Sequence, residues 1–141
     1  MRAVIDTNVV FEGLTKRSGA SSVILRFWSR QLFTPCVSLP LALEYEDVLA
    51  RLLSSQRWVR VKPALRRLLD TAEQTQIYYR WRPSSPDPGD EFLIDCAMNA
   101  RAAVVTKTRK DFRLAELNLG LRVMDPVEFV THILEQHNGT I

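Results

Sequence analysis

The first residues of the chain restrict its fold more than any other stretch. Residues 3–5, Ala-Val-Ile, form an apolar run without polar alternation, and the run stops at Asp6. Such a run is typical of a strand buried on both faces of a parallel sheet. Asp6 would then lie at the carboxyl end of that strand, where open α/β sheets bind their ligands. The alternative is that Asp6 is only a cap or turn former, beside Thr7 or Asn8, which can themselves cap a following helix.

Short apolar runs alternate with amphipathic segments along the rest of the chain. This alternation predicts an α/β fold in which a central parallel sheet carries helices on both faces. We expect one domain over residues 1–141, with a frayed tail at 138–141. The further expected strands are 33–37, 77–79, 103–106 and 121–124. The expected helices are one turn at 11–14, then 21–28, 38–52, a helix that begins at Pro63, 90–101, a short helix after residue 117, and 125–134. The expected connections are a basic segment at 57–62, a loop at 83–89 and a basic loop at 107–117.

Composition narrows the class of protein. The 141 residues are 46% hydrophobic and 25% charged, which is ordinary for a soluble globular domain, and no apolar stretch is long enough to cross a membrane. We expect no secretion signal and a cytoplasmic location, because Asp6 interrupts the first apolar run. Cys36 and Cys96 lie in apolar runs and are expected to be buried thiols in a reducing compartment. The net charge of +3 permits a polyanionic partner.

Two more acidic residues, far from Asp6 in the sequence, stand at the edge of an apolar helical face. Asp90 shares a helical face with Leu93, Ile94 and Ala97, and Glu44 borders the apolar stripe of the 38–52 helix. An acidic group at the tip of a packed face needs a partner or a metal. The alternatives are that Asp90 is an N-cap and Glu44 a solvated surface residue.

The neighbours of these acidic residues are expected to do other work. Glu91 and Asp95 fall off the apolar face of their helix and are expected to be solvated, the alternative being that either forms an outer shell of the site. Thr106 ends a strand at the same sheet edge as Asp6. Thr106 and Thr108 carry short side chains with a hydroxyl group. These hydroxyls could bind a metal-bound water or a phosphate, or they could only cap the loop.

The proposed ligands are all oxygen donors. Asp6, Glu44 and Asp90 have no soft ligand nearby in the sequence, and the two histidines, His132 and His137, lie near the C-terminus. Such a set suits Mg²⁺ or Mn²⁺ rather than zinc. A site of this kind activates water and stabilises an in-line phosphodiester displacement.

The ordered set of these motifs resembles the PIN-domain ribonucleases, and within them the VapC-like toxin components of toxin–antitoxin pairs. The resemblance covers essentially the whole chain. The segments that carry it are Val4-Ile5-Asp6-Thr7-Asn8-Val9-Val10, Leu43-Glu44-Tyr45-Glu46-Asp47-Val48-Leu49, Asp87-Pro88-Gly89-Asp90-Glu91-Phe92-Leu93 with Ala97, Val104-Val105-Thr106, and Asp111-Phe112.

The resemblance implies a three-layer α/β/α PIN-like fold and metal-dependent endonucleolytic cleavage of RNA. It implies a metal site formed by Asp6, Glu44 and Asp90, with Asn8 and Thr106 as polar supports. It also implies a homodimer and an antitoxin protein that blocks the site.

The chain departs from the family pattern at one acidic position. Thr108 stands where the family has its fourth acidic residue, and Asp111, three residues further on, matches the arrangement of some relatives. Asp111 either completes the catalytic and metal-binding set, or the chain has a reduced acidic set and binds metal more weakly. The second case describes a non-catalytic PIN-type module that binds RNA or protein.

Basic residues offer a path for RNA. We expect phosphate contacts from a cluster that follows the fourth strand, made of Lys107, Arg109, Lys110 and Arg113. Trp58 and Trp81 are each flanked by basic residues, a pattern that suits base stacking or partly buried tryptophans among solvated charge.

A phosphatase of the haloacid-dehalogenase type is a third hypothesis. It would use Asp6 as the nucleophile and would require a second aspartate two residues later. Asn8 occupies that position, which argues against it.

Overall fold

Five parallel strands form the centre of the molecule. The computed structural model describes residues 1–81 and 85–138. Its sheet has the strand order β3-β2-β1-β4-β5, with every pair parallel, so the predicted α/β/α architecture is confirmed. The strands are β1 (Arg2–Ile5), β2 (Thr34–Val37), β3 (Glu73–Gln74), β4 (Ala103–Val105) and β5 (Val123–Met124). The last three residues of the expected frayed tail, 139–141, lie outside the described residues, as do Arg82 and residues 83–84 of the expected loop.

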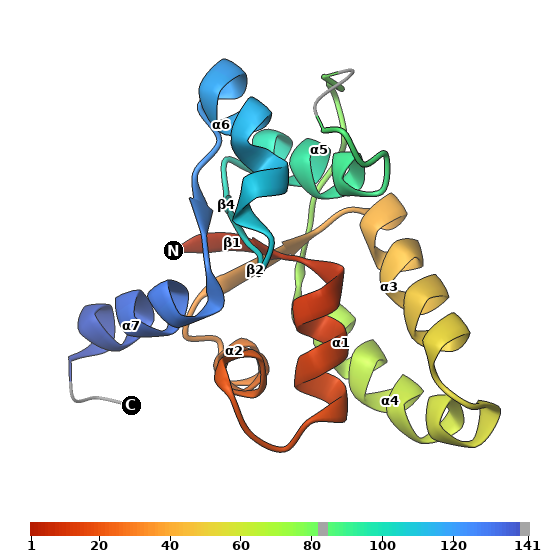
Figure 1. The fold of residues 1–141 in the computed structure, drawn as a ribbon. Helices are drawn as coiled ribbons and strands as arrows, with labels where there is room; N and C mark the ends of the chain where they lie inside the picture. The colour runs from red at the N-terminus through yellow and green to blue at the C-terminus, as the bar shows by residue number, and fades with distance from the viewer. Residues whose placement is uncertain (82–84, 139–141) are drawn as a thin grey trace.

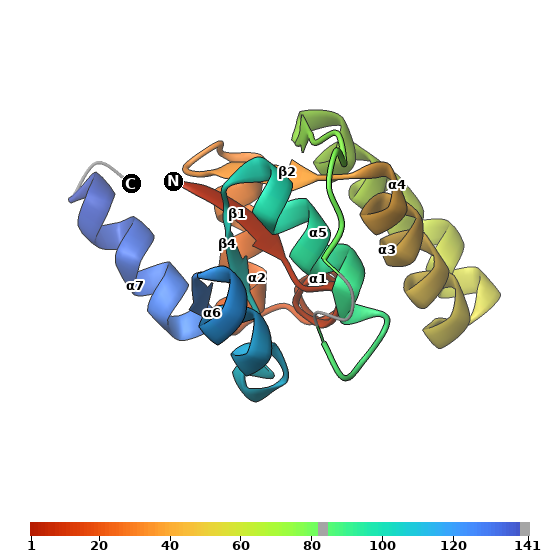
Figure 2. The same cartoon turned by 90° about the horizontal axis from the view of Figure 1, so that it is seen from above.

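Helices cover both faces of this sheet (Figures 1 and 2). Helices α5 and α6 lie above the sheet in Figure 1 and α1, α2 and α7 below it, while α3 and α4 pack side by side next to α1. Among the described residues, no helix is both long enough and apolar enough to cross a membrane. The helices are α1 (Thr7–Thr15), α2 (Ala20–Ser29), α3 (Leu39–Leu52), α4 (Ser55–Thr71), α5 (Asp90–Ala100), the 3₁₀ helix η1 (Arg109–Phe112), α6 (Arg113–Leu119) and α7 (Pro126–His137).

The register of β1 and β4 places their carboxyl ends side by side. Ile5 pairs with Val105, and the backbone N–H of Asp6 donates to the carbonyl of Val105 over 2.9 Å. Thr106 in turn donates its backbone N–H to Met124. Two polar side chains one hundred residues apart therefore leave the sheet at the same edge.

The buried core includes the aromatic residues of α2 and both cysteines. Phe27 and Trp28 belong to the core, and the indole N–H of Trp28 donates to the carbonyl of Leu68 over 2.9 Å. Cys36 and Cys96 are buried free thiols, as predicted. Burial raises the pKa of Cys96 to about 11, which keeps that thiol protonated.

Three of the predicted helix starts are wrong. The stretch 107–117, expected to be a loop, already contains η1 and the start of α6 at Arg113, because the Asp111 N–H donates to the Thr108 carbonyl and closes a first helical turn. Helix α1 begins directly after Asp6 rather than at residue 11, because the Asp6 carbonyl accepts the N–H groups of Val9 and Val10. Helix α4 begins at Ser55, with Ser54 as its N-cap, and runs through Pro63. Proline removes the helical N–H donor that would reach the carbonyl of Val59, and Pro63 and Val59 are both exposed residues.

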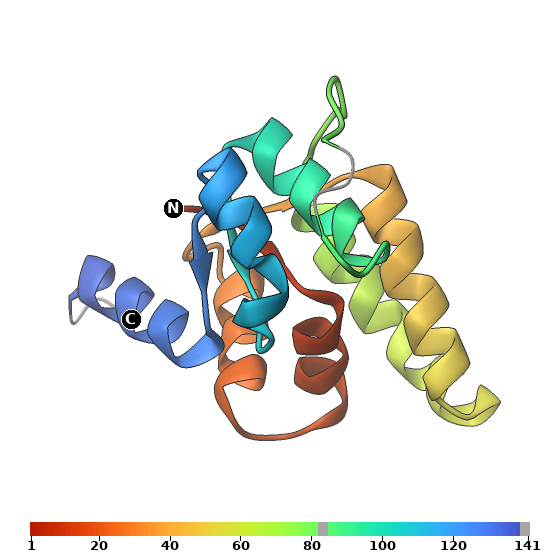
Figure 3. The same cartoon turned by 45° about the horizontal axis from the view of Figure 1, so that its top comes forward.

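The expected strand at 77–79 does not form. The edge strand β3 ends at Gln74, and residues 75–81 run without regular structure between α5 and the start of α3 (Figures 2 and 3). This segment covers a second face of α5, so Asp95 is buried there and the prediction that it is solvated was wrong.

Candidate active site

Asp6 lies at the centre of the carboxyl edge of the sheet and is only 5% exposed. The Thr106 hydroxyl donates to Asp6 Oδ2 over 2.6 Å, and Thr108 Oγ1 lies 3.2 Å from the same hydroxyl oxygen. Because the one hydroxyl proton of Thr106 is used on Asp6, Thr108 is the donor of the second bond. The backbone N–H of Thr108 also donates to Thr106 Oγ1, over 3.1 Å. The two threonines therefore fix the orientation of the Asp6 carboxylate.

Helix α3 fixes the end of β1 from the other side. The phenol of Tyr45, which is fully buried, donates to the carbonyl of Ile5 over 2.5 Å. Burial, with a contribution from the negative charge of Asp6, raises the pKa of Tyr45 well above its usual range. Tyr45 therefore stays protonated and keeps donating to the residue before Asp6. Sequence analysis placed Tyr45 in the matching motif but gave it no role, since its target is a backbone atom forty residues away.

Two further aspartates share the electrostatic environment of Asp6. Burial raises the pKa of Asp6, the nearby Thr106 hydroxyl opposes that rise, and the charge of Asp111 adds to it. Burial raises the pKa of Asp90 to about 7, and the charges of Asp6, Asp87 and Asp111 contribute in that order. Asp6 and Asp111 therefore lie near enough to Asp90 for their charges to disfavour its ionisation, and Asp111 has the same effect on Asp6.

The loop before α5 links two of these aspartates. The Ser85 hydroxyl donates to the backbone carbonyl of Asp111 over 3.4 Å and accepts the backbone N–H of Asp87 over 3.2 Å. The same Ser85 side chain lowers the pKa of Asp90 against the larger effect of burial. Ser85 therefore ties η1 to the N-terminus of α5.

Glu44 and Asn8 are placed less closely. Glu44 is half-buried on α3, and within the described residues it makes no hydrogen bond or ion pair with the three aspartates. Asn8 has an exposed side chain, although its backbone N–H lowers the pKa of Asp6. In the described part of the chain, no three carboxylate, histidine or cysteine side chains lie close enough to form a complete metal site.

The donors present nevertheless suit a hard divalent cation. Asp6, Asp90 and Asp111 supply only oxygen atoms, and the charges of Asp6 and Asp111 raise the pKa of Asp90. A cation between them would remove this repulsion, and carboxylate oxygens are what Mg²⁺ and Mn²⁺ bind.

The comparison with known protein families decides the family. The sequence profile of the PIN domain matches residues 2–110. This chain belongs to the PIN domain family. Among curated proteins, no match was found.

Solved structures of similar fold agree with this PIN assignment. At 14 to 19% identity they show the shared fold alone. One is VapBC2 from Rickettsia felis bound to a DNA fragment from its promoter, with a TM-score of 0.64 and 14% identity over 89% of this chain and 98% of that chain. A second is FitAB bound to the IR36 DNA fragment, with a TM-score of 0.62 and 19% identity over 88% of this chain and 94% of that chain. A third is VapBC-1 from nontypeable Haemophilus influenzae, with a TM-score of 0.57 and 15% identity over 90% of this chain and 99% of that chain.

The basic residues after β4 divide into two pairs in this PIN domain. Lys107 forms an ion pair of 2.5 Å with Glu12, and Arg109 contacts Glu116 and Glu128 at 3.4 and 3.5 Å. Lys110 and Arg113 have no carboxylate partner within 4 Å among the described residues, and they line a hollow of about 350 Å³. The second pair therefore has positive charge to offer a phosphate, whereas the first pair is already balanced.

Glu12 was not singled out from the sequence. It accepts hydrogen bonds from Lys107 and from Ser21 on α2, and it lies 3.8 Å from Lys16. The sequence gives little sign of this role, because the three partners of Glu12 come from separate segments of the chain. The one sign was that Glu12 lies on the helix that directly follows Asp6.

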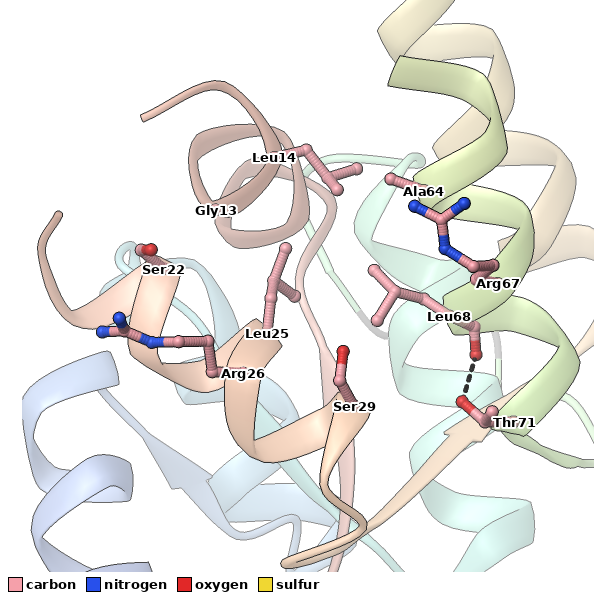
Figure 4. Close-up of a pocket in the computed structure, with 10 residues that line it drawn as sticks. All are labelled: Gly13, Leu14, Ser22, Leu25, Arg26, Ser29, Ala64, Arg67, Leu68 and Thr71. Carbon is pink, nitrogen blue, oxygen red and sulfur yellow. Dashed lines mark hydrogen bonds between the residues drawn. The ribbon is translucent and has the colours of Figure 1, made fainter. Parts of the chain in front are cut away.

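A larger hollow of about 430 Å³ lies between α1, α2 and α4 (Figure 4). Leu14, Leu25 and Leu68 supply apolar surface, and Arg26 and Arg67 stand on opposite sides of it. Neither arginine has a carboxylate partner within the described residues. The groove therefore has an apolar centre and a positive charge on each side.

Proposed function

We propose that this PIN domain is a Mg²⁺- or Mn²⁺-dependent endoribonuclease of the cytoplasm that hydrolyses RNA phosphodiester bonds as the toxin of a toxin–antitoxin pair. The observation that carries the proposal is that the charge of Asp111 acts on Asp6, and the charges of Asp6 and Asp111 act on Asp90, at the carboxyl edge of the sheet. Asp6 directly follows β1, Asp90 begins α5 and Asp111 lies in η1, so only the folded chain assembles them.

Each residue has a role in this proposal. Asp6, Asp90 and Asp111 would hold the metal, with Glu44 from α3 as a further candidate ligand. Thr106 keeps the Asp6 carboxylate oriented, and Lys110 and Arg113 bind the phosphates of the strand. When bound, a divalent cation supplies an activated water and stabilises the negative charge that develops on the phosphate.

A protein partner is suggested by the similar structures and by the groove between α1, α2 and α4. Two of the similar structures are VapBC assemblies and a third is FitAB, in which a protein of this fold is found with a second component. The groove between α1, α2 and α4 suits an amphipathic segment that presents apolar side chains to Leu25 and Leu68 and acidic groups to Arg26 and Arg67. An antitoxin with such a segment is the partner we propose, acting on a homodimer of this chain.

The test of the nuclease is cleavage of a labelled single-stranded RNA by the full chain. We expect cleavage with Mn²⁺ or Mg²⁺, none with EDTA, and a loss of at least about a hundredfold in Asp6→Asn and in Asp90→Asn, because each variant removes a proposed ligand. Asp47→Asn is the matched control, since Asp47 is exposed on α3 and contacts only Arg51, at 3.2 Å. Wild-type rates in both Asp6→Asn and Asp90→Asn would refute the proposed site.

A second function is favoured by one observation. Thr108, which replaces an acidic residue of the family pattern, is hydrogen-bonded to Thr106 and contributes no charge to the site. A non-catalytic module that binds RNA or protein would show binding without metal-dependent turnover. In that case Thr108→Asp would be expected to create divalent-dependent cleavage, whereas in an active nuclease the same change alters an existing rate.

A further inference from the structure

The most exposed aromatic rings of the described residues lie on the segment between β3 and α5. We call residues 77–81 the aromatic strap. Tyr78 is 87% exposed and Tyr79 is 61% exposed, whereas the third tyrosine, Tyr45, is fully buried. The rings of Tyr79 and Trp81 contact each other, with centroids 4.7 Å apart and an interplanar angle of 49°. With so much of their surface exposed, Tyr78 and Tyr79 contribute little to the packing of the core.

Asn99 of α5 fixes the backbone of the strap. Its side-chain oxygen accepts the N–H groups of Tyr78 and Tyr79 over 3.0 and 3.2 Å. Its side-chain nitrogen donates to the carbonyls of Tyr79 and Asp95, both over 2.8 Å. Three of these bonds hold the strap against α5, and the fourth anchors the Asn99 amide to its own helix. The exposed rings therefore project from a fixed backbone, and binding them costs little further conformational entropy.

The charge around the strap favours an anionic ligand. Residues 75–86 contain no acidic residue, and Arg80 is exposed between Tyr79 and Trp81. The one carboxylate that shares a small hollow with Arg80 is Asp95, which is itself buried. Flat aromatic faces next to a guanidinium group are the surface on which single-stranded nucleic acids stack.

The strap also lies within reach of the candidate active site. Nine residues separate Asp90 from Asn99 on α5, which corresponds to about 13 Å along the helix. A strand with about 3.4 Å between nucleotides covers that distance in about four nucleotides. The views from above and from the tilted front both show the chain of the strap running beside α5 (Figures 2 and 3).

We propose that Tyr78 and Tyr79 form a stacking subsite for the bases of single-stranded RNA, held in place by Asn99 and a few nucleotides away from the catalytic carboxylates. This inference rests on the proposed nuclease function for the identity of the ligand. Stacking engages the face of any base, so the subsite strengthens binding without selecting a sequence.

The test is RNA affinity measured without turnover. A fluorescein-labelled twelve-nucleotide polyuridine is titrated with the full chain in EDTA, and binding is followed by fluorescence anisotropy. We expect Tyr78→Ala and Tyr79→Ala each to weaken binding about tenfold, and Tyr78→Phe, which keeps the ring, to bind within about twofold of wild type. Trp81 fluorescence should be quenched by the RNA in wild type and not in Tyr79→Ala.

Leu52→Ala is the control, because Leu52 is an apolar side chain, 58% exposed, at the C-terminal end of the separate helix α3. It should leave RNA affinity and Trp81 quenching unchanged. Sedimentation of the same variants distinguishes a protein partner. If Tyr78→Ala or Tyr79→Ala changes the mass of the free protein, the strap is a contact between copies of the chain and the proposal is wrong.

The outcomes for the strap and for the nuclease are separable. Equal RNA affinity in wild type and both alanine variants, or no RNA binding at all, overturns the stacking subsite. Weakened binding in the alanine variants together with no metal-dependent cleavage by wild type would keep the subsite and refute the nuclease.

Discussion

Asp6 keeps a carboxylate where little water reaches it. Burial raises its pKa, and the local groups that oppose this effect are the Thr106 hydroxyl and the backbone N–H groups of Thr7 and Asn8. These groups are neutral dipoles, so they orient the carboxylate without neutralising it. Residual negative charge that the protein does not balance is what a cation site requires.

Asp90 gives a pH-dependent stability that can be measured. Its folded pKa of about 7 lies above the ordinary value of 3.8, so between these values the folded chain holds a proton that the unfolded chain has lost. The free energy of unfolding therefore falls as the pH rises from about 4 to about 7. In EDTA at pH 8 we expect Asp90→Asn to be more stable than wild type by about 1–3 kcal/mol, which allows for solvent screening of a half-buried group.

Urea unfolding at pH 8 and at pH 5 checks this expectation. The advantage of Asp90→Asn should shrink at pH 5, where most of the folded chain already carries a proton on Asp90. Asp47→Asn, at an exposed position, should show no such pH dependence. An advantage of the same size at both pH values would contradict the electrostatic explanation.

At the scale of elements, local patterns predicted what local forces decide. The helix from Ser38 to Leu52 was predicted because Ser38 caps it and its apolar stripe is regular, and both features are present. The helix that contains Pro63 was predicted, but its first eight residues, 55–62, were missed because a proline in sequence ordinarily marks a helix start. The segment 77–79 was expected to be a strand, but its N–H groups bind the side chain of Asn99, twenty residues away, instead of a neighbouring strand.

The contact between α1 and α2 depends on one residue without a side chain. A Cβ atom at Gly13 would lie 2.6 Å from the Leu25 side chain and 2.7 Å from the Ser21 carbonyl. Alanine ordinarily favours a helix over glycine by about 1 kcal/mol, but here the two helices would have to separate. We expect Gly13→Ala to lower the free energy of unfolding by about 1–3 kcal/mol, measured by urea denaturation.

Gly89→Ala is the matched control for that variant. Gly89 has a right-handed helical backbone, and a Cβ atom there would meet only Asp87 Oδ1 at 3.4 Å, an ordinary contact. Its stability should equal or exceed that of wild type. If Gly13→Ala is as stable as Gly89→Ala, the close approach of α1 and α2 is not a constraint on this fold.

At the scale of the whole molecule, parallel strands explain how far the site could be predicted. Asp6 and Thr106 were expected at one edge because both follow apolar strands, and the β1–β4 register places them in hydrogen-bond contact. The pairing of Lys107 with Glu12 could not be predicted, since it depends on how α1 packs beside the chain after β4. Patterns in sequence predict which edge carries polar groups, but they do not predict which charges are already balanced there.

Metal binding should therefore stabilise the whole fold, because the unfolded chain does not assemble Asp6, Asp90 and Asp111. A ligand that binds only the folded state at a hundred times its Kd adds about 2.7 kcal/mol to the free energy of unfolding. For a domain of 141 residues this corresponds to a rise in Tm of about 6–10 °C. We expect that rise for wild type and for Asp47→Asn when Mn²⁺ is added at pH 7.5, and its loss in Asp6→Asn. A functional site should be nearly saturated at about 10 mM Mn²⁺. If calorimetry finds no rise in the Tm of wild type at that concentration, the three aspartates do not form a metal site.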